Sequence, residues 1–206
     1  MNFRIDNNLT FEDFKEIEEI EKSYFDIDTV VTSSQVYKWH LVNPDTEIVV
    51  KSIVNDEVVG QISVIPLSKE QYKNFINGDL KDTEINEDNI ITYINHCEYH
   101  LLFSCITIKK QYRENKMILY CLLKGLYEKI KYLESKDIKF INMCAEGQTT
   151  DGQNFLEKFL SLKLMGKTKD NYSLYYFEKD YNDFDNWFTA FPTYIEKYYN
   201  NFSNAY

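Results

Sequence analysis

The chain has 206 residues with 44% hydrophobic and 16% aromatic content, which is enough material for one hydrophobic core. Its net charge of −10 excludes a general nucleic-acid binder, because such proteins need lysines and arginines to displace counterions from phosphates. The sequence has no apolar run of about eighteen residues, and its start, MNFRIDNN, lacks the basic and apolar regions of a signal peptide. We therefore expect a cytoplasmic protein with no membrane partner.

Helical patterns dominate the first 45 residues. A short strand is expected at residues 3–5, and apolar residues at helical spacing then predict an amphipathic helix over residues 10–25. The same stretch begins with a capping-box pattern. A second helix is expected to begin near Ser33 or Ser34 and to end before Pro44, because the residue before a proline disfavours the helical conformation.

Two strands and a short helix are predicted next. The runs EIVVKSIV and VVGQISVIPL are rich in β-branched residues and are separated by a turn-forming Asn-Asp-Glu sequence, which indicates a hairpin. Ser68 then caps a helix with the sequence KEQYKNFI, which ends at Asn77-Gly78. The acidic segment GDLKDTEINEDN follows.

The second half of the chain alternates between strands and helices. The run EYHLLFSCITIK is apolar on both faces, which favours a central strand, and it leads into a helix over residues 115–135. A buried strand at residues 137–145, a helix with the sequence DGQNFLEKFLSL and a closing strand, NYSLYYFEK, complete the order. Strands that precede helices require a parallel pair, whereas the hairpin is antiparallel, so the sheet is predicted to be mixed.

Residues 181–206 form an aromatic-rich extension to a main domain over residues 1–180. Its aromatic side chains, Trp187 and Phe188 among them, suit docking on the chain's own domain or in a homodimer. The four cysteines show no CxxC pairing and lie in apolar runs, so we expect buried free thiols. We expect no metal site.

The stretch SCITIKKQYRENKMILYCLL, together with the order of the elements, resembles the GNAT superfamily of N-acetyltransferases. The resemblance covers about residues 1–179. It implies an α/β fold of GNAT type: a mixed, mostly antiparallel sheet with one parallel strand pair and helices on both faces. It also implies acetyl-CoA as co-substrate and a primary amine, in a small molecule or a peptide, as the acetyl acceptor.

The CoA-binding signature of that family, V-x-P-x-x-(Q/R)-x-x-G-x-(G/A), is degenerate here. One register places Arg113, Lys116 and Ile118 at its last three defined positions, and another register places Gln111, Glu114 and Lys116 there. Neither register contains a glycine. Glycine lets backbone approach phosphate closely, so its loss adds side-chain bulk at the expected pyrophosphate site.

The turn from Lys109 to Lys116 is nevertheless the clearest basic cluster of an acidic chain. The resemblance implies that N–H groups of residues 114–118 bind the pyrophosphate at a helix N-terminus, with Arg113 and Lys116 as charged donors. The alternative is a solvated helix start, where Glu114 only complements the helix dipole. The preceding strand would bind the pantetheine. The predicted cofactor-binding residues are Ile106, Thr107, Ile108, Arg113, Glu114, Asn115, Lys116, Met117 and Ile118.

Catalysis would need a base for the ammonium proton and an acid for the thiolate. The two-residue period of the strand places four side chains on one face: Glu98, His100, Leu102 and Ser104. His100 is the predicted base because imidazole titrates near neutrality, and Glu98 is an alternative or an orienting group. His100 in a merely structural role stays open. Tyr172 is the predicted acid, with Tyr175 and Tyr176 as alternatives.

The second family signature, N-x-x-A-x-x-x-Y, maps onto Thr149, Gly152 and Leu156, so its tyrosine is missing. This departure keeps a second hypothesis open: a non-catalytic GNAT-fold module that senses CoA or binds a protein.

The acidic segment allows two interpretations as well. It either lines the acceptor side of a cleft and attracts a cationic amine, or is a solvated loop. Its acidic residues are Asp79, Asp82, Glu84, Glu87 and Asp88.

Overall fold

A computed structural model describes residues 2–177 and 193. In this part of the chain seven strands form one sheet in the order β1-β2-β3-β4-β5-β7-β6. The strands are β1 (Phe3–Asp6), β2 (Glu47–Ser52), β3 (Val58–Leu67), β4 (Glu98–Ile108), β5 (Lys139–Gly147), β6 (Lys163–Lys167) and β7 (Ser173–Tyr176). The pair β4–β5 is parallel and the other neighbouring pairs are antiparallel. The prediction of a mixed, mostly antiparallel sheet is therefore confirmed.

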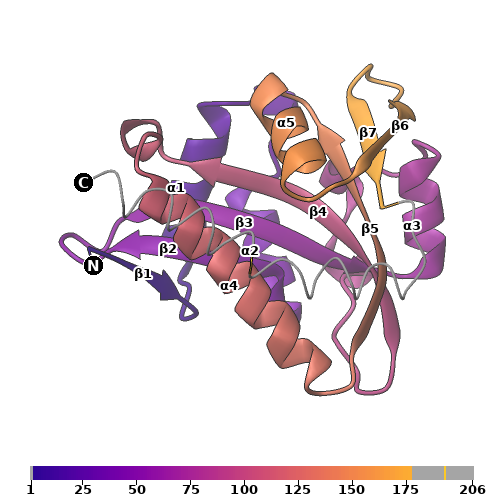
Figure 1. Ribbon diagram of the computed structural model, residues 1–206, viewed down its shortest axis with the longest axis horizontal. Coiled ribbons are helices and arrows are strands. Elements are labelled where there is room, and N and C mark those ends of the chain that lie inside the picture. The colour runs from indigo at the N-terminus through magenta and orange to yellow at the C-terminus, as the bar shows by residue number, and fades with distance from the viewer. Residues whose placement is uncertain (1, 178–192, 194–206) are drawn as a thin grey trace.

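Helices cover both faces of this sheet (Figure 1). They are α1 (Phe11–Lys22), α2 (Ser33–Val42), α3 (Lys69–Ile76), α4 (Lys116–Glu134) and α5 (Thr150–Lys158). Side chains of α1, α2 and α3 pack on one face, and those of α4 and α5 pack on the other. Gly125 lets α4 approach β2 closely, because a Cβ atom there would lie 2.6 Å from Ile48 Cγ2. None of the helices in the described residues is long and apolar enough to cross a bilayer.

Most predicted elements are present near their expected bounds, and α3 begins after the predicted cap at Ser68. The helix predicted over residues 151–162 differs, because α5 ends at Lys158 and the chain turns at Ser161, where φ is +52°. Residues 163–167 then form β6, which sequence analysis did not predict. This edge strand is mostly exposed and has no alternating pattern, so its pairing with β7 defines it. The aromatic extension, residues 181–206, lies outside the described residues apart from residue 193.

Two irregularities in β4 create an opening in the sheet. In the pairing with β3, Cys105 lies opposite Ser63 and Phe103 lies opposite Val64, so Ser104 is the extra residue of a β-bulge. On its other edge β4 pairs with β5 only as far as Phe103 and Ala145. Beyond this point β5 continues its pairing with β7. Residues 104–108 of β4 therefore have an edge that no strand covers in the described chain.

Candidate functional site

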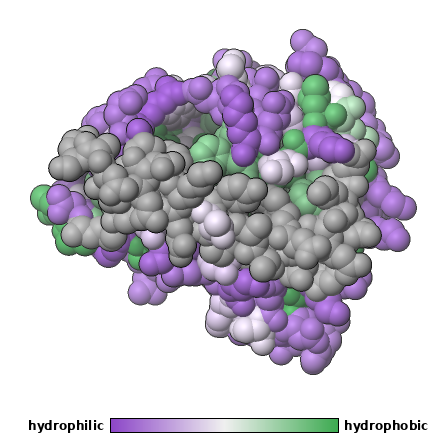
Figure 2. Space-filling view, viewed as in Figure 1, coloured by the Kyte–Doolittle hydropathy of each residue, from purple (hydrophilic) through white to green (hydrophobic). Residues whose placement is uncertain are grey.

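A cavity of about 410 Å³ lies where β4 and β5 diverge. Its walls come from β4 between Phe103 and Ile108, from the first turns of α5, from the end of α1 and from the neighbouring strands β2 and β3. Figure 2 shows a hollow between α5 and the segment that follows β4, with hydrophobic residues inside and hydrophilic residues along its rim.

The bulge at Ser104 determines which β4 side chains face α1. Side chains alternate between the two faces of a strand, and one extra residue reverses the alternation. Leu102 packs with α2 and α3, whereas Phe103 packs beneath α4, as expected for neighbours. After the bulge, Cys105 lies on the α1 face and Ile106 packs on the α4 side. Beyond the bulge, the face on which Leu102 lies therefore continues with Cys105 and Thr107 and not with Ile106 and Ile108.

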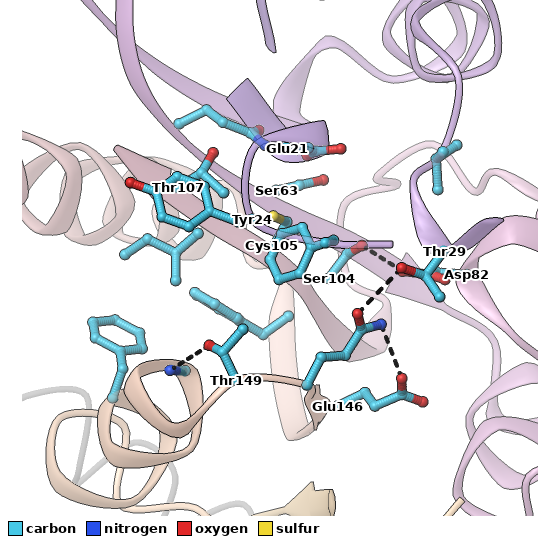
Figure 3. Close-up of a pocket in the computed structure, with 18 of the residues that line it drawn as sticks. Glu21, Tyr24, Thr29, Ser63, Asp82, Ser104, Cys105, Thr107, Glu146 and Thr149 are labelled. Atoms are coloured by element: carbon cyan, nitrogen blue, oxygen red, sulfur yellow. Dashed lines mark hydrogen bonds between the residues drawn. The ribbon is translucent and has the colours of Figure 1, made fainter. Parts of the chain in front are cut away.

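Besides Asp151 in the first turn of α5, four carboxyl groups line the cavity, and they come from four separate parts of the chain: Glu21, Glu47, Asp82 and Glu146. In Figure 3, Glu21 lies on one side of Cys105, and Asp82 and Glu146 lie on the other. Asp82 accepts a hydrogen bond from Ser104 Oγ at 3.2 Å. Of the five acids in the acidic segment, Asp82 is thus the one that reaches the cavity.

The other three carboxyls are each held by a neighbouring side chain. Gln61 Nε2 donates to Glu21, and Ser63 Oγ donates to Glu47 Oε1 at 2.8 Å. Gln148 Nε2 donates to Glu146 Oε1 at 3.1 Å. These contacts fix the carboxyls without neutralising them, because amides and hydroxyls carry no charge.

Burial and mutual repulsion keep these acids protonated to an unusually high pH. Burial raises the pKa of Glu21 and of Glu146 to about 7. It also raises the pKa of Glu47 well above its ordinary value and that of Asp82 above its own. The pKa of the Cys105 thiol is raised well above its usual range by burial and by the nearby carboxylates. Cys105 is therefore a poor nucleophile. All four cysteines are free thiols, but Cys97 and Cys105 are half-buried, whereas buried thiols were predicted.

The cavity also contains polar atoms that lack partners. Among the described residues, five buried side-chain polar atoms have no hydrogen-bond partner, and four of them belong to residues that line the cavity. These four are Trp39 Nε1, Glu47 Oε2, Gln61 Oε1 and Thr107 Oγ1. Buried polar groups are almost always hydrogen-bonded, so this concentration indicates a space that a polar ligand or water completes.

The predicted cofactor-binding residues fall into two groups. Ile106, Thr107, Ile108 and Arg113 line the cavity. The remaining five, residues 114–118, do not line it. Asn115 instead caps α4, where its side chain accepts a hydrogen bond from Met117 N at 3.1 Å, and Ile118 is fully buried in the core beneath α4. The described residues with positive φ lie outside residues 109–118, so the missing glycines cause no backbone strain there.

The basic cluster is partly neutralised by acids that are distant in sequence. Lys109 forms an ion pair with Glu57 at 2.6 Å. Arg113 forms an ion pair with Asp151 in the first turn of α5, and its guanidinium lies 6.0 Å from the centre of the Tyr24 ring. The pair joins the segment after β4 to α5 on the opposite wall of the cavity.

The predicted catalytic residues lie outside the cavity lining. His100 Nδ1 is hydrogen-bonded to the Asn142 side chain, and the imidazole stacks on Tyr72 with ring centres 4.5 Å apart. Glu98 is exposed at the start of β4. Tyr172 lies between β6 and β7, where its backbone N–H donates to Thr168 Oγ1. The catalytic roles of these residues stay predictions that the cavity does not support.

Three of the carboxyl groups that line the cavity were not predicted from the sequence: Glu21, Glu47 and Glu146. Glu47 could have been singled out from the sequence, because an acid in a predicted buried strand next to a hairpin is unusual. Glu146 follows directly on a predicted strand and carried a weaker signal. Glu21 is one of several glutamates in α1, and nothing in the sequence distinguishes it from its exposed neighbours.

No protein-family model and no curated protein sequence matches the chain. Solved structures do match. The loading GNATL domain of CurA from Lyngbya majuscula has a TM-score of 0.54 at 10% identity, over 88% of this chain and 98% of that one. A chain of the NatC complex bound to Gag peptide and CoA has a TM-score of 0.53 at 10% identity, over 85% of this chain and 96% of that one.

A third match is the PaiA N-acetyltransferase from Thermoplasma acidophilum in complex with coenzyme A, with a TM-score of 0.50 at 14% identity, over 88% of this chain and all of that one. At such low identity these likenesses establish the fold. The chain has the GNAT fold, as the order of its elements predicted.

Proposed function

We propose that the protein is an N-acetyltransferase that moves the acetyl group of acetyl-CoA directly to a primary amine. The main observation in support of this proposal is the opening between β4 and β5, which joins an uncovered strand edge to a cavity lined by carboxyl groups. The structures of the NatC complex and of PaiA, which share the fold, contain CoA and support this proposal.

The uncovered edge of β4 suits the pantetheine arm. Ile106, Thr107 and Ile108 pair with β3 on one side, and the backbone groups on their other side face no strand among the described residues. An extended arm with amide groups can hydrogen-bond to such an edge, as an added strand does. Backbone N–H groups near Cys105 would then polarise the thioester carbonyl. Arg113, at the rim, would bind a phosphate.

We assign the general base to Glu21. An amine is mainly protonated at neutral pH and must lose a proton before it attacks, so a base with a pKa near 7 is well matched. Glu21 has that pKa and contacts Cys105 on β4. One ammonium proton goes to Glu21, the amine nitrogen bonds to the acetyl carbon, and the C–S bond breaks as the CoA thiolate leaves. The second nitrogen proton is released as the amide forms and balances the proton that the thiolate takes up. Protonation of the thiolate by Tyr172 stays a prediction.

Calorimetric titration with acetyl-CoA tests the first part of the proposal. We expect saturable binding at micromolar to sub-millimolar concentration. The absence of binding at millimolar acetyl-CoA would overturn the assignment. If acetyl-CoA binds, release of the CoA thiol should be measured with a panel of primary amines, with the protein omitted as the control.

A second candidate function is a CoA-binding module without catalysis. It is favoured by Leu156, which lines the cavity at the position of the family tyrosine and has no proton to give to a departing thiolate. This candidate predicts CoA binding with no thiol release for any amine in the panel.

A further inference from the structure

We propose that the acceptor is a diamine or polyamine, with one amine at the β4 opening and a second ammonium group on Glu47. This inference rests on the proposed function and specifies its substrate class.

The charge of the cavity is the first argument. Besides Asp151, four carboxyl groups line it, and among the described residues Arg113 is the one basic side chain in the lining. Arg113 already pairs with Asp151, which also lines the cavity. The four carboxyls therefore have no cation in the cavity to offset them. Protons largely neutralise these carboxyls when no cation is bound. A ligand with one ammonium group would stabilise an ionised carboxylate at one place, whereas a ligand with two would do so at two places.

Glu47 is the second and independent argument. Its side chain is buried, with the residue 3% exposed, and it lies in the floor of the cavity on β2. Oε1 accepts the hydrogen bond from Ser63, but Oε2 has no partner. The cation that lowers its pKa is Lys129, which is ion-paired with Asp45 outside the cavity lining. A buried carboxyl oxygen without a partner is costly, and an ammonium group is the donor that fits it.

The spacing is the third argument. Glu47 and Cys105 both lie opposite Ser63, one on each side, so two strand spacings separate their backbones. At about 4.8 Å per spacing this is about 10 Å. Cys105 marks the place where the thioester would lie, so the second carboxyl is several carbon atoms away from the reacting nitrogen. Val36 and Trp39 line the cavity between α2 and the sheet and provide apolar surface for a methylene chain.

The test compares diaminobutane with butylamine, which differ by one terminal ammonium group. For the wild-type protein with saturating acetyl-CoA, we expect kcat/KM for diaminobutane to exceed that for butylamine at least about tenfold, which corresponds to about 1.4 kcal/mol. In Glu47→Gln, which keeps the shape and can still accept from Ser63, the ratio should fall toward one. Glu12→Gln, an equal charge change at an exposed position of α1, should keep the wild-type ratio.

The outcomes separate this inference from the proposed function. If amines are acetylated but the wild-type protein does not prefer diaminobutane, the inference is wrong and the acetyltransferase assignment stands. If the preference exists and survives in folded Glu47→Gln, the assignment of the second ammonium to Glu47 is wrong. If no amine is acetylated, calorimetric titration with diaminobutane alone decides: binding that Glu47→Gln weakens supports the inference, and absence of binding overturns it.

Discussion

Glu47 and Cys105 lie on either side of Ser63 in one cross-strand row, with the Ser63 hydroxyl donating to Glu47. This row connects β2, which sequence analysis treated as ordinary hairpin structure, with the bulged part of β4. A buried acid that is far from the opening in sequence is thus part of the same cavity surface. If the proposed function is right, this row lets one cavity hold both the acyl donor at the strand edge and a cationic acceptor.

The stability of the protein should decrease as the pH rises from about 5 to about 8. The pKa values of Glu21 and Glu146 rise from an ordinary 4.5 to about 7, so the folded protein binds more protons than the unfolded chain in this window. Glu47 and Asp82 act in the same direction. Burial lowers the pKa of His40 below its ordinary 6.5, so the contribution of His40 to stability increases as the pH rises toward 6.5. This is one group against the four carboxyls, so the net stability still decreases.

Thermal unfolding measured across this range checks the prediction. We expect Tm to fall by about 5 °C or more, given about 2–4 °C per kcal/mol for a chain of this size. Glu21→Gln should reduce the slope, because it removes one titrating group. Acids with lowered pKa values, such as Glu57 at about 2, lose their contribution only at lower pH and do not disturb the window. A Tm that rises with pH would contradict the assigned environment of the carboxyls.

Glu21→Gln should lower kcat by about 10²- to 10⁴-fold, the usual contribution of a general base. The KM for acetyl-CoA should change little, because Glu21 lies on the acceptor side. In the wild-type protein, kcat/KM should rise with pH through about 7, and this limb should disappear in the variant. Glu19→Gln, an equal change at an exposed position of the same helix, is the control. If Glu146→Gln showed this loss of kcat and Glu21→Gln did not, the general base would be Glu146 on β5.

His100→Ala should leave kcat within about twofold of the wild-type value, because the imidazole does not line the cavity. The variant should lose about 1–2 kcal/mol of unfolding free energy through the lost Tyr72 stacking and Asn142 hydrogen bond. Asn142→Ala removes the same hydrogen bond and should also destabilise the fold without affecting kcat. A hundredfold drop in kcat for a folded His100→Ala protein would restore His100 as the base.

Asp151→Asn should tighten acetyl-CoA binding. Releasing Arg113 from an exposed ion pair is worth up to about 1 kcal/mol, or about fivefold in Kd. Arg113→Ala should weaken binding about tenfold, since a hydrogen bond to a charged group contributes about 1.5–3 kcal/mol. The double variant should match Arg113→Ala. Asp88→Asn, at an exposed position outside the cavity lining, controls for net charge. Equal Kd values for all variants would remove Arg113 from the cofactor site.

The fold was accessible from the sequence because its main signals are local. Helix caps such as Ser68, the hairpin and the long apolar β4 run each depend on residues that are close in the chain. The edge strand β6 escaped prediction because its conformation depends on pairing with β7 rather than on its own pattern.

The site was less accessible because it is made by contacts between distant segments. Counting by two from His100 along β4 leads past Ser104 to Ile106, but the bulge places Cys105 and Thr107 on that face instead. The partners of the basic turn, Glu57 and Asp151, lie 52 and 38 residues away from Lys109 and Arg113. Only the folded chain shows that these charges are paired and that Glu21 and Glu47 share one cavity.

The bulge at Ser104 also means that β4 carries one residue more than its ladder with β3 needs. Phe103 and Cys105 already lie opposite the consecutive residues Val64 and Ser63, so without Ser104 they would follow each other in a regular ladder. Ile106 and Ile108 would stay in the packing beneath α4, and Cys105 and Thr107 would keep their place in the cavity wall. Omission of Ser104 would instead remove the local irregularity of the strand and the contact with Asp82, so the bulge shapes the cavity without choosing which residues line it beyond Cys105.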